Sequence, residues 1–169
     1  MNTIYRRHDT PLGPMILAAT AAGLCGAWFE GQAHFAGVVH AWREDRASPL
    51  LNEAARQLDA WFAGTRRDFN LPLAPQGTAF QQAVWAQIAA IGLGHTARYG
   101  DIAHAIGKPA AARAVGAATG RNPLSIIVPC HRVLGSDGAL TGYAGGLARK
   151  RALLEIELER SSERVRTTT

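Results

Sequence analysis

A cysteine and a histidine, Cys130 and His131, are adjacent in the segment 126–133. A thiolate is a strong nucleophile, but a free thiol with a pKa of about 8.5 is mostly protonated at neutral pH. A neighbouring imidazole is a common base for activating it. A structural role is equally compatible with the pair, because free cysteine is among the most buried residue types. The pair therefore indicates either an activated nucleophile or a packing residue.

The residues before the cysteine favour a short buried strand. Ile126, Ile127 and Val128 form an apolar, β-branched run, and Pro129 follows them. A proline ends or bends a strand and lacks a backbone donor. We therefore expect a strand over 126–128 and a fixed turn that carries the cysteine.

The composition fits a folded protein with a basic surface. The chain has 169 residues, of which 47% are hydrophobic and 18% charged. This length gives one large or two small domains. Lys and Arg outnumber Asp and Glu by 18 to 13, for a net charge of +5. Such a balance favours a polyanion partner, although a solvated basic surface would look the same.

Two cysteines, Cys25 and Cys130, make no disulfide framework in a domain of this size. We therefore expect a reducing, cytoplasmic location. Residues 1–7 lack the apolar core of a signal peptide, and no segment is long and apolar enough to cross a bilayer. Cys25 falls within an expected strand, without Cys or His at metal-ligand spacing, which indicates packing.

The first 75 residues favour a small α/β unit. We expect three strands, over 3–7, 14–19 and 24–29. Apolar residues at three- and four-residue spacing predict a helix over 49–63, and Gly64 is a typical cap. Two prolines and a glycine in 71–77 indicate a linker, so we expect domains over 1–75 and 76–160.

The second part begins with a helix signal. Thr78 followed by Gln81 has the form of a capping box, and apolar spacing continues the helix to about residue 91. Two short helices, 99–106 and 110–119, have the proportions of a helix-turn-helix, which is also an ordinary packing unit. We expect a hairpin turn over 135–138, a glycine loop over 142–146 and a helix over 147–160. The polar residues 161–169 lack a period and predict a frayed, disordered tail.

The helix over 110–119 consists almost entirely of small residues, with Arg113 as its one long side chain. In a core, this composition gives close helix packing. At a surface, it fits a narrow groove into which Arg113 would reach, while Arg121 adds charge for phosphate contacts. Core packing accounts for the alanines but not for the central arginine.

Together these segments resemble the O6-alkylguanine-DNA alkyltransferase family, also called methylated-DNA–protein-cysteine methyltransferases. The matching motifs are Pro-Cys-His-Arg-Val at 129–133, Asn-Pro at 122–123, Ala-Arg-Ala-Val-Gly at 112–116, Tyr-Gly-Asp-Ile-Ala at 99–103 and Gly-Tyr-Ala-Gly-Gly-Leu at 142–147. The resemblance is strong over 78–157 and mostly architectural over the first 75 residues. It implies an α/β (α+β) fold, with a three-stranded RNase H-like domain before a mostly helical domain that holds the helix-turn-helix.

The resemblance also implies a reaction. Cys130 accepts the alkyl group of O6-alkylguanine, and also of O4-methylthymine, once and irreversibly. His131 takes the thiol proton, in the family through a bridging water, and Glu157 holds and polarises the imidazole. Helix spacing makes Glu155 and Glu159 available as well, so the choice of Glu157 depends on the resemblance.

Other roles follow from the same resemblance. Tyr99 supplies a proton to the leaving guanine, and Asn122 braces the cysteine loop. Without the resemblance, Tyr99 would be a core residue with one hydrogen bond and Asn122 a turn residue. The expected substrate pocket is formed by Val133, Tyr143, Ala144, Gly145 and Gly146. Ala144 stands where many relatives carry serine, and Gly92 replaces a proline.

The implied partner is double-stranded DNA, approached through the minor groove by a protein that flips the damaged base out of the stack. Arg113 would fill the gap that the base leaves. The expected DNA contacts are Arg113, Arg121, Arg132, Ala112, Ala114 and Gly116. We expect no metal, no cofactor and no membrane, and a monomer that can cluster on DNA.

Two other functions use the same features. A Cys-His acyl hydrolase or transferase would need an oxyanion hole, for which Gly145 and Gly146 could supply backbone donors. A non-catalytic helix-turn-helix DNA binder would need no reactive cysteine, and Cys130 argues against it.

Overall fold

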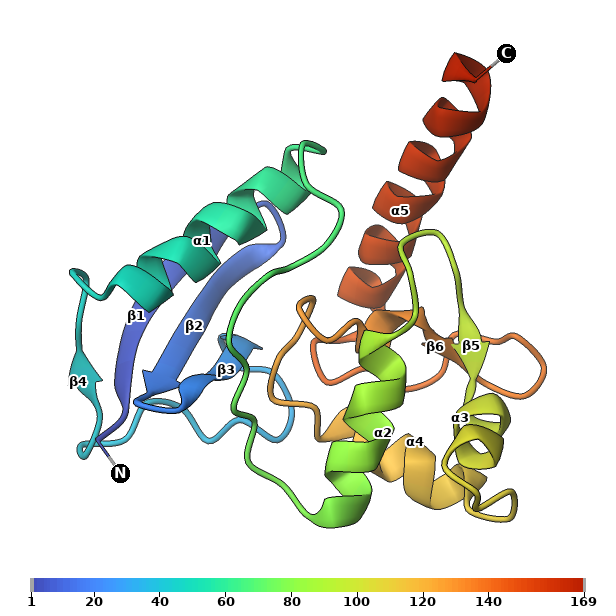
Figure 1. The fold of residues 1–169 in the computed structure, drawn as a ribbon, viewed down its shortest axis with the longest axis horizontal. Helices are drawn as coiled ribbons and strands as arrows, with labels where there is room; N and C mark the ends of the chain where they lie inside the picture. Colours follow the sequence, from blue (N-terminus) through green and yellow to red (C-terminus); the bar gives the residue numbers. More distant parts are fainter. Residues whose placement is uncertain (1, 169) are drawn as a thin grey trace. The chain divides into compact units, whose positions relative to one another are not determined.

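The computed structural model describes residues 2–168, which form two compact units. The first unit contains the chain up to Gln76 together with Pro123–Ile127. The second contains Gly77–Asn122 and the chain from Val128 onward. The first is a sheet covered by one helix and the second is mostly helical, so the expected mixed α/β class is confirmed (Figure 1).

The sheet of the first unit has the order β3-β2-β1-β4. The three expected strands are present as β1 (Ile4–Thr10), β2 (Gly13–Thr20) and β3 (Gly23–Phe29), paired antiparallel. β4 (Arg43–Glu44) pairs parallel with β1. The sequence pattern missed β4, because two exposed charged residues carry no apolar alternation.

Helix α1 (Pro49–Phe62) lies along β1 and β2 (Figure 1). It begins where the Ser48 hydroxyl accepts from the backbone N–H of Leu51, and a proline at its start needs no donor. Its apolar face is buried against the sheet. The fully buried side chains of this core include Leu51, Leu58, Trp61, Leu17 and Met15. Burial of each such large side chain contributes about 1.5–3 kcal/mol.

The segment Pro123–Ile127 follows the edge of β3. The Ala27 N–H donates to the Pro123 carbonyl over 2.8 Å, and the Ser125 N–H donates to the Ala27 carbonyl over 2.9 Å. The predicted strand over 126–128 is wrong, because the chain turns there and Ile126 has φ of 72°. A positive φ is unusual for a β-branched residue. The apolar pattern did predict that residues 126–128 are buried, and they are buried within this turn.

The second unit opens with α2 (Ala79–Ala89) and the predicted capping box. The Gln81 N–H donates to the Thr78 hydroxyl over 3.1 Å, and the Thr78 N–H donates to the Gln81 side-chain oxygen over 2.9 Å. On the buried face, the Trp85 indole N–H donates to the Ala118 carbonyl over 2.8 Å. This bond joins α2 to α4.

Two short helices form the expected helix-turn-helix, α3 (Tyr99–Ala105) and α4 (Ala112–Gly120). β5 (Ala97–Arg98) leads directly into α3 and pairs parallel with β6 (Val133–Leu134). A short 3₁₀ turn, η1 (Cys130–Arg132), leads into β6. The two-stranded sheet therefore joins the start of α3 to the end of the cysteine turn.

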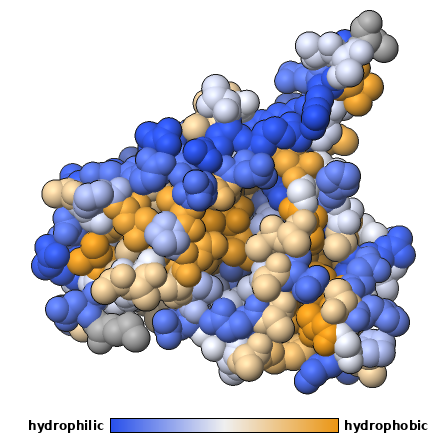
Figure 2. All heavy atoms as spheres, in the orientation of Figure 1, coloured by the Kyte–Doolittle hydropathy of each residue, from blue (hydrophilic) through white to orange (hydrophobic). Residues whose placement is uncertain are grey.

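Helix α5 (Leu147–Thr167) is longer than the sequence predicted. Residues 161–167 were expected to form a frayed tail, but the helix continues through them with mainly hydrophilic side chains on its surface (Figure 2). Hydroxyls of Ser161, Ser162 and Thr167 donate to carbonyls four residues earlier, and Arg164 and Arg166 suit the negative end of the helix dipole. A helix without an apolar stripe lacks the period on which the prediction depended.

No helix within residues 2–168 has both the length and the apolar character needed to cross a membrane.

The capping box at α2 generates a stability prediction. Thr78→Ala removes the acceptor for the Gln81 N–H, so we expect the free energy of unfolding to fall by about 1 kcal/mol. Urea denaturation monitored by circular dichroism measures it. Thr78→Ser keeps the hydroxyl and should match the parent protein, whereas an equal loss in both variants would contradict the cap.

Candidate active site

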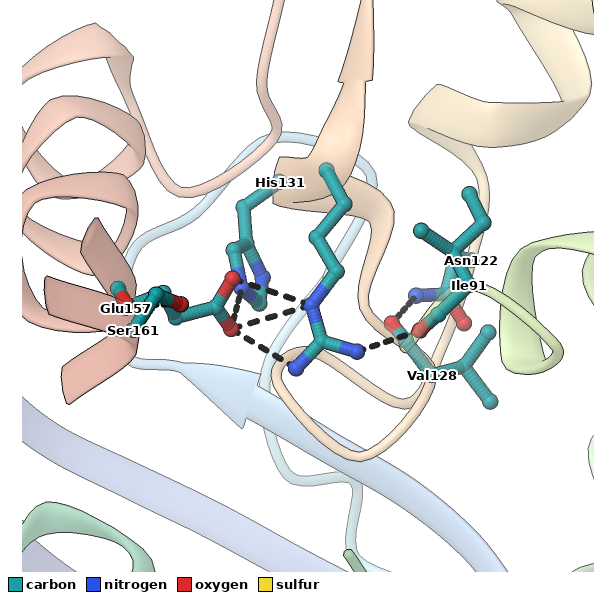
Figure 3. Close-up of polar contacts among 7 residues, drawn as sticks. Ile91, Asn122, Val128, His131, Glu157 and Ser161 are labelled. Atoms are coloured by element: carbon teal, nitrogen blue, oxygen red, sulfur yellow. Dashed lines mark hydrogen bonds and ion pairs between the residues drawn. The ribbon is translucent and has the colours of Figure 1, made fainter. Parts of the chain in front are cut away.

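Cys130 is the first residue of the η1 turn and is only 4% exposed. The Val128 carbonyl accepts the Cys130 N–H over 2.8 Å and the Asn122 side-chain N–H over 2.8 Å. The Arg132 N–H donates to the Pro129 carbonyl over 2.9 Å. The thiol is therefore carried on a turn whose backbone is held by hydrogen bonds, and the Asn122 side chain contributes one of them (Figure 3).

Burial raises the pKa of the Cys130 thiol. A hydrogen bond from Asn122, the charge of Lys150 and backbone N–H groups of the turn act in the opposite direction without cancelling the effect of burial. The thiol is consequently protonated at neutral pH, and it needs a base before it can act as a nucleophile.

The His131 side chain is fully buried, and its Nε2 lies 2.7 Å from Oε1 of Glu157 (Figure 3). An ionised carboxylate can only accept a hydrogen bond, so Nε2 carries the proton and Nδ1 has the lone pair. Burial lowers the pKa of His131 more than the hydrogen bond and charge of Glu157 raise it. The imidazole is therefore neutral at pH 7 and able to take up a proton.

Glu157 on α5 is shared between His131 and Arg132. Arg132 Nε lies 3.0 Å from each carboxylate oxygen, and Nη2 lies 2.7 Å from Oε1. Burial raises the pKa of Glu157, but hydrogen bonds from His131 and Arg132, together with the positive charge of Arg132, outweigh it and lower the pKa overall. The carboxylate is therefore ionised. Removing one partner of such a buried pair typically costs about 3–5 kcal/mol.

Arg132 does not belong with the predicted DNA contacts. It is only 6% exposed, and its remaining guanidinium nitrogen, Nη1, donates to the Ile91 carbonyl. We correct its assignment from DNA binding to support of Glu157. Of the three glutamates that the sequence left open, Glu155 and Glu159 are exposed, and only Glu157 reaches the histidine.

Lys150 is a site residue that sequence reasoning missed. Its side chain is fully buried, and its Nζ donates to the carbonyls of Val133 and Thr141 over 2.7 Å each. Burial lowers the pKa of Lys150, while the nearby Cys130 thiolate would raise it. Because Lys150 lies between two arginines in the sequence, it looks like part of the solvent-exposed face of the helix. The available signal was its three-residue spacing from Leu153, which placed it on the buried side of the helix.

The Tyr99 hydroxyl lies 3.2 Å from Oγ1 of Thr141, at the start of the glycine loop. Within the predicted pocket, Val133 and Gly145 are buried, Tyr143 and Ala144 are half-buried, and Gly146 is exposed. Gly146 adopts φ of 92°, a left-handed conformation that favours glycine. The chain turns there into α5.

Helix α4 exposes arginines and alanines to solvent on one face. Arg113, Ala114, Ala117 and Arg121 are exposed, whereas its opposite side buries Val115, Ala118 and Thr119. Ala112 and Gly116 are half-buried. Core packing therefore does not account for the exposed alanines, and the structure favours the surface interpretation of this helix. The two arginines lie about 12 Å apart along the helix axis.

These contacts can generate a nucleophile. A neutral imidazole can accept the proton of a thiol, directly or through a water molecule, and the carboxylate stabilises the imidazolium that forms. Whether the product is stable then depends on the electrophile. Acyl transfer would give a thioester that water hydrolyses, whereas alkyl transfer would give a thioether that water does not remove.

Two family models match the chain. "6-O-methylguanine DNA methyltransferase, ribonuclease-like domain" matches residues 3–75, and "6-O-methylguanine DNA methyltransferase, DNA binding domain" matches residues 79–159. Together they span most of the chain.

Relatives and solved structures agree with this match. Methylated-DNA--protein-cysteine methyltransferase from Mycobacterium tuberculosis is 47% identical over 157 residues, which is 93% of each chain. The protein of the same name from Methanosarcina barkeri is 48% identical over 153 residues, which cover 90% of this chain and 96% of the relative. The crystal structure of M. tuberculosis OGT in complex with DNA superposes with a TM-score of 0.86 at 47% identity, covering 93% of this chain and 94% of that one.

The buried histidine generates a pH prediction. Its pKa is lowered in the folded protein, so below about pH 6.5 the unfolded chain binds a proton that the folded protein does not. This contribution to stability is therefore lost as pH falls, at up to about 1.4 kcal/mol per pH unit. Glu157, whose pKa is also lowered, adds a loss only at more acidic pH.

Urea denaturation between pH 7.5 and 5 measures the slope. His131→Gln keeps a donor for Glu157 but does not titrate, so its unfolding free energy should depend less steeply on pH. Identical slopes in the two proteins would show that His131 is not held neutral.

Proposed function

The chain belongs to the family of 6-O-methylguanine DNA methyltransferases, and we propose that it repairs O6-alkylguanine in double-stranded DNA by transferring the alkyl group to Cys130. The observation that supports this assignment best is the buried contact of 2.7 Å between His131 and Glu157, next in sequence to the thiol. It supplies a base to a cysteine that burial keeps protonated.

The proposed reaction is a displacement at the saturated carbon of the alkyl group. His131 takes the thiol proton, and Glu157 stabilises the imidazolium. The sulfur then forms a bond to the alkyl carbon while the bond from that carbon to O6 breaks. The departing guanine gains negative charge, which Tyr99 relieves by donating its phenolic proton. We propose that Asn122 holds the turn and that the glycine loop with Val133 lines the pocket.

The product ends the reaction. A thioether is not hydrolysed, so each molecule accepts one alkyl group and direct reversal of the damage is stoichiometric. The same reaction applies to O4-methylthymine. A Cys-His hydrolase is not favoured, since the relatives are methyltransferases that transfer to cysteine. An inert DNA binder is not favoured either, because it would need neither the thiol nor its relay.

Access to a stacked base requires that the base be flipped out of the duplex. We propose that the exposed face of α4 enters the minor groove, since its alanines permit close approach. Arg113 would fill the gap in the stack, and Arg121 would contact phosphate. Ala112, Ala114 and Gly116 would form the rest of this contact.

The first 75 residues would then support a DNA-binding and alkyl-acceptor domain over 76–160. We propose that the protein acts on DNA as a monomer, and clustering of several copies stays a prediction. Cys25 and Cys130 are both free thiols, which supports a reducing compartment such as the cytoplasm.

Alkyl transfer predicts a defined change in mass. We expect duplex DNA carrying O6-methylguanine to give one methyl adduct on the intact protein, mapping to Cys130 by peptide mass spectrometry. Cys130→Ala should show no adduct, and repaired DNA should never exceed protein. Cys25→Ala is the matched control and should react like the parent protein. Repeated turnover would contradict the proposal and favour a hydrolase, and tight binding without an adduct would favour an inert binder.

Base flipping predicts a difference between substrates. Arg113→Ala should weaken capture of O6-methylguanine from duplex DNA by about tenfold or more, while the reaction with free O6-benzylguanine changes little. Single-turnover kinetics on both substrates measure this. Arg67→Ala, which removes an exposed arginine from the first unit, is the charge-matched control. Equal losses on both substrates would show that Arg113 does not act in flipping.

A further inference from the structure

A pair of hydroxyls joins the proposed proton donor to the glycine loop. Tyr99 and Thr141 are separated by 42 positions in the chain, yet the Tyr99 hydroxyl lies 3.2 Å from Oγ1 of Thr141. Tyr99 begins α3, whereas Thr141 lies where the chain enters the loop. The phenol therefore has a hydrogen-bonding partner on the loop before any base arrives.

Both members of this pair are positioned by the same strand, β6. In the β5-β6 pair, Ala97 lies opposite Val133, and Tyr99 follows β5 directly. The buried Lys150 donates over 2.7 Å to the carbonyls of Val133 and Thr141. Because charged donors make the stronger hydrogen bonds, Thr141 is held firmly at its backbone. The β5-β6 pairing thus positions Tyr99 relative to β6, and Lys150 positions Thr141 relative to the same strand. The two hydroxyls are thereby held beside each other.

The direction of this hydrogen bond affects the chemistry. A hydroxyl donates one proton and also accepts, so either partner could donate. Donation from Thr141 to the phenolic oxygen leaves the Tyr99 proton available for the base. It also stabilises the negative charge that develops on the phenolic oxygen as that proton leaves. Donation in the other direction would occupy the proton that the leaving group needs.

We propose that Thr141 is a positioning residue for alkyl transfer, whose hydroxyl donates to Tyr99 and directs the phenolic proton towards the leaving guanine. This inference rests on the proposed function. In the balanced step, the thiol proton goes to His131, the sulfur–carbon bond forms, the carbon–O6 bond breaks, and guanine takes the phenolic proton. The His131 imidazolium then releases its proton to solvent, and Tyr99 takes one up from solvent, so no proton is gained or lost overall. Ala144 has no hydroxyl to offer, so the loop reaches the phenol through Thr141.

Two substitutions isolate the hydroxyl. Thr141→Val keeps the shape of the side chain and removes the donor, whereas Thr141→Ser keeps the donor. We expect single-turnover methyl transfer from O6-methylguanine in duplex DNA to slow by about threefold to tenfold in the valine variant, which corresponds to one hydrogen bond. The serine variant should react at close to the parent rate. An unchanged rate for Thr141→Val would overturn the proposal.

A double-mutant cycle tests whether Thr141 acts through Tyr99. If it does, Thr141→Val should slow the parent protein but have no further effect in a Tyr99→Phe background. If the valine substitution slows both backgrounds by the same factor, Thr141 acts independently of the phenol and the proposal is wrong.

A second methyl donor separates positioning from general damage to the site. Methyl iodide transfers the same group to Cys130, but iodide leaves without a proton. We expect Thr141→Val and the parent protein to be methylated by it at equal rates, measured by mass spectrometry. Equal slowing with both donors would mean that the substitution disturbs the thiol, contradicting the proposal. A parent protein that reacts with methyl iodide but not with DNA would instead refute the proposed function.

Discussion

The buried carboxylate of Glu157 is the constraint on which the site depends. An ionised carboxylate at 2% exposure is unfavourable unless donors surround it, and here His131 and Arg132 supply them. Both donors belong to the η1 turn, next to the nucleophile, while Glu157 belongs to α5. The need to satisfy one charge therefore holds the last helix against the turn. It also determines which nitrogen of the imidazole keeps its proton.

The rest of the site extends from this contact through the backbone. Asn122, which follows the end of α4, donates a hydrogen bond to the turn that carries the cysteine. The cysteine turn is therefore connected directly to the helix that exposes Arg113. On the other side, Lys150 ties the glycine loop to β6, which pairs with the strand leading into Tyr99. The groups that would remove a proton and the group that would supply one are consequently positioned by the same short segment, 130–134.

Much of this could be predicted from the sequence, and the failures have identifiable physical causes. The apolar spacing of 49–63 and the capping pair of Thr78 and Gln81 are local signals, and both helices formed as expected. The run 126–128 was predicted to be a strand because β-branched residues favour strands, but the preceding residues pair with β3 and the chain then turns at Ile126. Arg132 and Lys150 looked like surface cations, since composition does not reveal which charged residues find buried partners. Those partnerships are long-range contacts, which only the folded chain brings together.

We infer above all that Glu157 holds His131 as a neutral imidazole with its proton on Nε2, which leaves Nδ1 to accept the proton of Cys130. Nitrogen-15 NMR of the His131 ring at neutral pH tests this directly, since the shifts of the two nitrogens differ between tautomers and from the imidazolium. We predict a protonated Nε2 and an unprotonated Nδ1 in the unreacted protein. A proton on Nδ1, either in the other tautomer or in the imidazolium, would contradict it, because the histidine could not then act as the base.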